Sequence, residues 1–165
     1  MIAGLLAAVS LFACYLPPVA AQIAVPFVRP ACSYCPGHRG VEYTLAPGTV
    51  VAAVAQGVVT FSGTVAGTRY VVVLQADGLR ATYGMLQSAA VSRGDVVLAG
   101  QVTGHSGPHL YFGLRDAADN PVDPTLLLGV LIGRPRLVPS DGSSPRRAPP
   151  PRLSCVAGVS VGFPV

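Results

Sequence analysis

The stretch that decides the fold is residues 71–84, VVVLQADGLRATYG. It places Asp77-Gly78 between two apolar runs, and an Asp-Gly pair in this setting is the strongest local signal for a β-hairpin. We expect a two-residue turn in which both Asp77 and Gly78 adopt a positive φ angle. The hairpin therefore predicts antiparallel β-structure in the middle of the chain.

Short apolar runs separated by turn residues continue on both sides of this hairpin. The runs cover residues 49–55, 58–65, 69–74, 96–98 and 108–114. Strands of this length and spacing are typical of an all-β fold, here a small antiparallel β-sandwich or barrel-like sheet. Residues 125–128 predict a short helical turn after Asp123-Pro124, and residues 131–138 predict a last edge strand.

The charge of the chain is concentrated at its C-terminal end. Its 165 residues correspond to one domain with a net charge of +4. Residues 22–130 carry six arginines and six carboxylates, whereas residues 131–165 carry five arginines and one aspartate. The folded part is thus close to neutral, which argues against nucleic-acid binding. The Pro/Arg-rich residues 139–165 predict a disordered tail, because they cannot bury enough apolar surface to offset the entropy of ordering.

Residues 1–21 form an apolar segment that ends in Val19-Ala20-Ala21. The segment predicts a secretory signal peptide cleaved near Ala21, although no positive charge precedes the apolar run. Two alternatives stay open: the segment is kept as an N-terminal anchor, or Leu11-Phe12-Ala13-Cys14 is a lipoprotein processing site with the lipid on Cys14. Contact with a membrane is expected only through such an uncleaved or lipidated N-terminus.

Residues 22–37 form a Pro-rich lead-in segment that contains the pair Cys32-x-x-Cys35. A thioredoxin-like role would need a helix after this motif, but Pro36-Gly37 follows it. A zinc knuckle that adds His38 lacks a fourth ligand. We therefore expect a local disulfide between Cys32 and Cys35, and the sequence leaves the partner of Cys155 open.

Several short motifs follow one another from residue 38 onward. They are His38-Arg39-Gly40-Val41-Glu42, Ala46 to Ala53, Thr82-Tyr83-Gly84-Met85, Arg93 to Gln101, and Gly107-Pro108-His109-Leu110-Tyr111. In this order and spacing they resemble the β-sheet core domain of the M23, or lysostaphin/LytM-like, peptidases. The resemblance runs from about His38 to Leu128, and on this basis residues 38–138 are assigned to an M23/LytM-like domain.

The resemblance implies a secreted zinc endopeptidase that cuts peptide cross-bridges of bacterial peptidoglycan. In this family the metal is held by the His and Asp of an HxxxD motif and by the second His of an HxH strand. The first His of HxH and the His of a Tyr-x-His motif orient the attacking water and stabilise developing charge.

This sequence keeps only part of that pattern. His38 matches the first metal ligand, and Glu42 stands where the family has Asp. His109 matches the first, catalytic His of HxH, so it is a family acid/base position. Tyr111 replaces the third metal ligand, and Met85 replaces the Tyr-x-His histidine. A catalytic zinc takes three protein ligands, and a neutral phenol with an ordinary pKa of about 10 is a poor substitute.

His105 is a candidate for the missing ligand, giving a site of His38, Glu42 and His105. It is expected in a loop before the strand at residues 108–114, where a histidine between small residues is more often simply exposed. Within that strand, His109 and Tyr111 should point to the same face, because strand side chains alternate.

The sequence thus predicts a secreted, cell-envelope LytM-like domain that is catalytically degenerate and needs no cofactor. Its groove, lined also by Tyr83, Tyr111 and Met85, is expected to bind peptidoglycan or a cell-wall hydrolase. The alternative is an active zinc metalloendopeptidase that cleaves peptidoglycan cross-links. A lipoyl or biotinyl carrier domain is excluded, because the chain has no lysine to modify.

Overall fold

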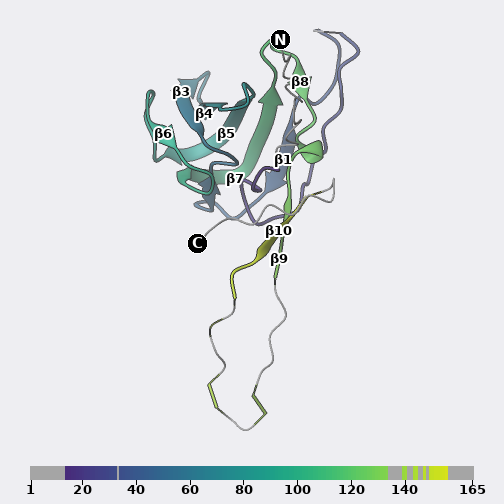
Figure 1. Ribbon diagram of the computed structural model, residues 1–165. Coiled ribbons are helices and arrows are strands. Elements are labelled where there is room, and N and C mark those ends of the chain that lie inside the picture. Colours follow the sequence, from purple (N-terminus) through teal and green to yellow (C-terminus); the bar gives the residue numbers. More distant parts are fainter. Residues whose placement is uncertain are drawn as a thin grey trace, which may run out of the picture.

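The computed structural model describes residues 14–32, 34–133, 139–140, 143–144, 147 and 149–155. Its main feature is one strongly twisted antiparallel sheet (Figure 1). The strands are β1 (Val41–Thr44), β2 (Val50–Ala52), β3 (Gly57–Val65), β4 (Thr68–Gln75), β5 (Arg80–Ala89), β6 (Val96–Val97), β7 (Val102–Arg115) and β8 (Pro121–Val122). The all-β antiparallel prediction is confirmed.

The sheet is organised around β7, its longest strand. The strand order is β1-β7-β5-β4-β3-β6, and the short strands β2 and β8 also pair with β7. Strand β7 therefore touches β1 on one side and β5 on the other, and it brings residue 38 onward next to the central hairpin.

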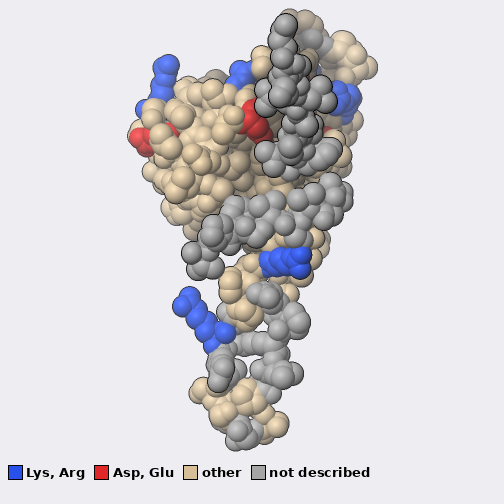
Figure 2. Space-filling model, viewed as in Figure 1, with Lys and Arg blue, Asp and Glu red and all other residues tan. Residues whose placement is uncertain are grey.

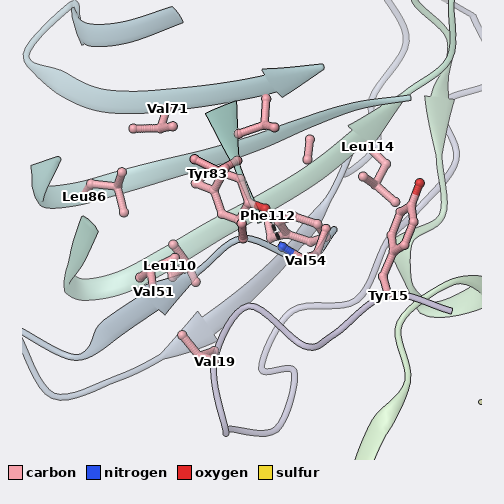
Figure 3. Packing of buried hydrophobic residues seen from close by; sticks show 14 of the residues in the cluster. Tyr15, Val19, Val51, Val54, Val71, Tyr83, Leu86, Leu110, Phe112 and Leu114 are labelled. Carbon is pink, nitrogen blue, oxygen red and sulfur yellow. Dashed lines mark hydrogen bonds between the residues drawn. The ribbon is translucent and has the colours of Figure 1, made fainter. Parts of the chain in front are cut away.

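The core lies on one face of this sheet. Tyr83 of β5 and Phe112 of β7 are fully buried, with ring centroids 5.3 Å apart (Figure 3). The backbone N–H of Val54 donates a hydrogen bond of 2.9 Å to the Tyr83 hydroxyl, so the one polar atom of that ring has a partner inside the core. Full burial of a large apolar side chain stabilises a fold by about 1.5–3 kcal/mol, so these rings anchor the sheet.

The hairpin predicted at residues 71–84 is present, but its turn differs from the expected one. Gly78 has φ +88°, whereas the φ angle of Asp77 is not positive. The N–H of Gly78 donates to the carbonyl of Gln75 at 3.0 Å, which closes a turn one residue longer than predicted. The two-residue turn with two positive φ angles lies instead at Ala66-Gly67, between β3 and β4 (φ 48° and 82°).

A small second sheet pairs two strands from the C-terminal part of the chain. Strand β9 (Val130–Ile132) runs antiparallel to β10 (Arg152–Ser154), below the main sheet in Figure 1. It follows a 3-10 helix, η1 (Pro124–Leu126), in which Asp123 accepts a hydrogen bond from the N–H of Thr125. The predicted short turn near residues 125–128 is thus present. The predicted edge strand is limited to β9, and residues 134–138 lie outside the described residues.

Residues 152–155 correct the prediction of a disordered tail over residues 139–165. Leu153 is 5% exposed, and Cys155 forms a disulfide with Cys14. A segment that is polar and Pro-rich on average still folds where one buried leucine and one cross-link fix it. The local disulfide predicted between Cys32 and Cys35 is confirmed.

The N-terminal segment is part of the fold from Cys14 onward. Tyr15 and Val19 belong to the hydrophobic core. Residues 1–13 lie outside the described residues, so the predicted signal peptide stays a prediction for them. In the part of the chain that the structure describes, no helix has the length and hydropathy needed to cross a bilayer.

Candidate functional site

His38 and Glu42 face each other at the edge of the main sheet. The lead-in segment runs beside β1, where the N–H and carbonyl groups of Val28 and His38 exchange hydrogen bonds of 2.8 and 2.9 Å. The Nδ1 atom of His38 lies 3.1 Å from the carbonyl oxygen of Pro26, which leaves Nε2 facing Oε1 of Glu42, also at 3.1 Å. Both side chains are about one quarter exposed (24% and 25%). The structure therefore brings these two candidate ligands together.

Tyr111 lies beside this pair. It is directly opposite Glu42 in the β1–β7 ladder, and its ring is perpendicular to the His38 ring, with centroids 6.0 Å apart and an interplanar angle of 88°. Three glycines make room for the ring. A Cβ atom built on Gly40, Gly84 or Gly113 would lie 2.7, 3.3 or 2.6 Å from an atom of the Tyr111 side chain. The phenol thus occupies a space that the sequence keeps free of other side chains.

The phenol of Tyr111 is held in its neutral form. Burial raises its pKa above the ordinary value, and the nearby guanidinium groups of Arg115 and Arg39 offset part of that rise. At neutral pH the hydroxyl therefore keeps its proton, and its oxygen is a weak donor to a metal ion.

His109 and Met85 flank the same face of β7. His109 is exposed and Tyr111 half-buried, whereas Leu110 between them is fully buried, which confirms that His109 and Tyr111 share a face. Met85 has a positive φ of 60° and lies where the β5–β7 register shifts. A Cβ on Gly107 would lie 3.1 Å from the carbonyl oxygen of Met85 and 3.9 Å from that of His109.

Tyr83 does not line this groove, so that prediction is wrong. Its side chain is 0% exposed and points into the core. Strict alternation would place residues 83 and 85 on one face. In the pairing with β4, however, Gly84 and Leu86 lie opposite the adjacent residues Tyr70 and Arg69. Strand β5 therefore has one extra residue at Met85, and such a bulge moves the following side chains to the opposite face. Met85, at 38% exposed, consequently faces away from the side to which Tyr83 points.

His105 lies within β7 and not in a loop before it. It pairs with Val50 on one side and Ser88 on the other, and its Nδ1 lies 3.1 Å from the Ser88 hydroxyl. The structure therefore does not bring His105 together with His38 and Glu42. Its side chain is engaged with β5 instead.

A surface groove of about 410 Å³ lies beside Met85. Its other lining residues include Pro47, Pro108, Arg69 and Gln87. Arg69 on β4 donates a hydrogen bond from its guanidinium to the Gln87 carbonyl on β5. Sequence reasoning missed Arg69 and Gln87, since only the pairing of β4 with β5 places them at the groove. On the face of the molecule that Figure 2 shows, charged side chains are few and scattered, which agrees with the balanced charge of residues 22–130.

Comparison with known proteins gives the family. Residues 36–124 match the model of peptidase family M23. The chain belongs to this family. A curated M23-type relative, the DD-carboxypeptidase/endopeptidase Mpg of Neisseria meningitidis, is 32% identical over 112 residues. The Neisseria gonorrhoeae protein of the same name is equally similar. The match covers 63% of this chain and 25% of each relative, so the chain spans about a quarter of their length.

Solved structures agree with the family assignment. Helicobacter pylori Csd3 superimposes with a TM-score of 0.62 and 26% identity, over 77% of this M23 chain and 36% of Csd3. The catalytic domain of lysostaphin from Staphylococcus simulans gives a TM-score of 0.55 over 63% of this chain and 89% of that domain. At 24% identity, the lysostaphin comparison supports the fold alone.

The donor set of this M23 chain decides whether it could hold a catalytic zinc. Such a zinc takes three protein ligands and leaves one position open. Over the described residues, no three His, Cys, Asp or Glu side chains lie close enough to hold one metal ion together. His38 and Glu42 supply two donors, and the third family position carries the neutral phenol of Tyr111. The described donors therefore do not fit a catalytic zinc.

Proposed function

We propose that this M23 chain is a domain of the bacterial cell envelope that binds peptidoglycan peptides without zinc-dependent cleavage. The observation that carries the proposal is the position of Tyr111, opposite Glu42 and edge-on to His38. Because the phenol fills the place of a third metal ligand, the site keeps its shape and loses a donor. The apolar N-terminal segment, if it acts as the predicted export signal, would direct the chain to this location.

The groove beside Met85 has chemistry suited to a short peptide. Pro47 and Pro108 offer apolar surface, and Arg69 offers a positive charge. Peptidoglycan peptides carry free carboxylates, and an arginine is well suited to hold a carboxylate through two parallel hydrogen bonds. Met85 has no proton to give or take, so it cannot act as the acid/base group that this family position supplies. These features favour binding over hydrolysis.

The alternative is a zinc peptidase, and one observation favours it. His38 is anchored by Nδ1 on the Pro26 carbonyl, and its Nε2 faces Glu42. Zinc-bound histidines are commonly oriented by such a carbonyl on the other ring nitrogen. A peptidase of this kind would need a third ligand beyond the donors described above.

Zinc content and binding to purified sacculi separate these two functions. We expect the purified full-length chain to hold clearly less than one zinc per molecule. We also expect it to sediment with sacculi whether or not a chelator is present, and to release no soluble peptides. Chelator-sensitive release of peptides that His38→Ala abolishes would overturn the proposal and establish the peptidase.

The location of the binding site has its own test. Arg69→Ala should weaken sedimentation with sacculi by about tenfold or more, because a charge-assisted hydrogen bond contributes about 1.5–3 kcal/mol. The matched control is Arg93→Ala, which removes the same charge from an exposed turn before β6. Equal binding by the two variants would place the peptide elsewhere on the domain.

A further inference from the structure

Residues 14–21 form a strap that crosses the edge of the main sheet. Its backbone is hydrogen-bonded at four points, which join the strap to β2, to the loop after β2 and to the residues around η1. The N–H of Tyr15 donates to Leu127 and its carbonyl accepts from Gly129, both at 2.8 Å. The N–H of Leu16 donates to the Val54 carbonyl, and the Pro18 carbonyl accepts from the N–H of Ala52, both at 2.9 Å.

The strap also contributes side chains to the core. Tyr15 is 3% exposed and Val19 is 4% exposed, and both point toward the buried residues of the sheet in Figure 3. The Tyr15 hydroxyl donates a hydrogen bond to the carboxylate of Asp77, at the turn of the central hairpin. The strap is therefore packed like an interior element and not like a loosely attached leader.

A disulfide closes the strap onto the far end of the chain. Cys14 is bonded to Cys155, which directly follows β10. A Cβ atom on Gly129 would lie 3.0 Å from the Cys14 sulfur and 2.7 Å from a methyl group of Leu153. The strap, the start of β9 and β10 thus meet at one place. All three lie outside residues 36–124, the part that matches the M23 family model.

We propose that the mature, folded protein keeps residues 14–21, so that any cleavage of the apolar N-terminus takes place before Cys14 and not after Ala21. Cleavage after Ala21 would take Tyr15 and Val19 out of the core and leave Cys155 without its partner. The proposal also assigns the Cys14 sulfur to a disulfide, which excludes a thioether-linked lipid on the same atom. It does not depend on whether the M23 site binds or cleaves peptides.

Direct analysis of exported protein tests this maturation point. The full chain is exported by a bacterial host, purified without reductant, and its N-terminus and disulfide-linked peptides are identified by mass spectrometry. We expect every folded molecule to contain residues 14–21 and to yield a peptide that joins Cys14 to Cys155. A mature N-terminus at Gln22, or a lipid on Cys14, would overturn the proposal.

Stability of matched variants provides a second, independent test. Cys14→Ser and Cys155→Ser should each lower the Tm by about 10 °C or more, and the double variant should lower it no further, because all three remove one cross-link. Cys32→Ser is the control: its disulfide spans a sequence separation of 3, against 141 for Cys14–Cys155, and a short closed loop constrains the unfolded chain less.

Each single cysteine variant leaves one free thiol, so a packing variant without a free thiol tests the strap independently. Val19→Ala should lower the Tm, whereas Ile23→Ala, just after the strap and 37% exposed, should change it little. If Cys14→Ser and Val19→Ala both left the Tm unchanged, the strap would be dispensable and the proposal would be wrong.

Discussion

Glu42 on β1 lies directly opposite Tyr111 on β7. Opposite residues of an antiparallel pair project from the same face of the sheet. The carboxylate that matches a family metal ligand and the phenol that replaces another are therefore immediate neighbours, with the His38 ring beside both. Under the proposed function, Tyr111 is the substitution at this site that removes a metal donor.

Restoring the missing donor should restore metal binding. Tyr111→His would place an imidazole opposite Glu42, in a space bounded by glycines, and complete a set of three donors with His38. We expect zinc affinity at pH 7 to rise by about 100-fold or more, since a lost first ligand should cost at least as much as a lost supporting group. Competition with a chromophoric chelator measures this change. Tyr111→Phe is the control, and a gain of the same size in both variants would rule out the explanation.

Gly113 and the ring of Tyr111 should be energetically coupled. Gly113→Ala would bring a Cβ to 2.6 Å from the Tyr111 hydroxyl, so the ring must shift. We expect a loss of about 1–3 kcal/mol in the free energy of unfolding, measured by urea denaturation. In a Tyr111→Ala background most of that loss should disappear. A loss that stays the same in both backgrounds would mean that the two residues act independently.

The buried hydroxyl of Tyr83 should contribute to stability and not to binding. Tyr83→Phe leaves the N–H of Val54 without its partner in the core, which should cost about 1–3 kcal/mol in the free energy of unfolding. Sedimentation with sacculi should not change. Tyr34→Phe, at a side chain 99% exposed, is the matched control and should be neutral. If Tyr83→Phe weakened binding to sacculi without lowering stability, Tyr83 would have to contribute to the binding groove after all.

Stability should fall in alkaline solution through the buried tyrosines. Burial raises the pKa of Tyr43 to about 12, against about 10 in the unfolded chain. Between these values the unfolded state loses its proton first. Stability is therefore fully present below pH 10 and is lost as the pH rises toward 12, by about 1.4 kcal/mol per pH unit for each such group. Burial raises the pKa of Tyr83 in the same direction.

Urea midpoints between pH 8 and pH 12 measure this dependence. The chain has no lysine, so no ammonium side chain titrates in the same window. Tyr43→Phe should show a shallower decline than the native chain. Parallel declines would indicate that Tyr43 ionises as readily in the folded state as in the unfolded state.

The turn at Gly78 offers a test of backbone conformation alone. Its φ of +88° is one that side chains with a Cβ rarely adopt, yet nothing lies within 4 Å of a Cβ built there. Gly78→Ala should therefore cost about 1 kcal/mol through backbone strain, and valine should cost more. An unchanged urea midpoint for the valine variant would mean that the turn relaxes without cost. Ala76→Ser, at an exposed position of the same turn, serves as the control.

Local patterns in the sequence determined the fold class of this protein. Apolar runs between turn residues predict the strands, because a half-buried strand needs little more than alternation and an end signal. Strand alternation also predicts the shared face of His109 and Tyr111, whereas His38 and Glu42 were assigned through the resemblance to the M23 motif. The Cys32–Cys35 disulfide was predictable as well, because its partners are close in sequence.

Only the tertiary structure decided the features that depend on distant parts of the chain. The bulge at Met85 reverses the alternation, so that Met85 is exposed while Tyr83 is buried, because one extra residue in a strand exchanges its two faces. The strap of residues 14–21 is an interior element only because η1, β2 and Cys155 come together around it. Sequence patterns report neighbours along the chain, whereas these contacts join residues up to 141 positions apart and exist only once the sheet has folded.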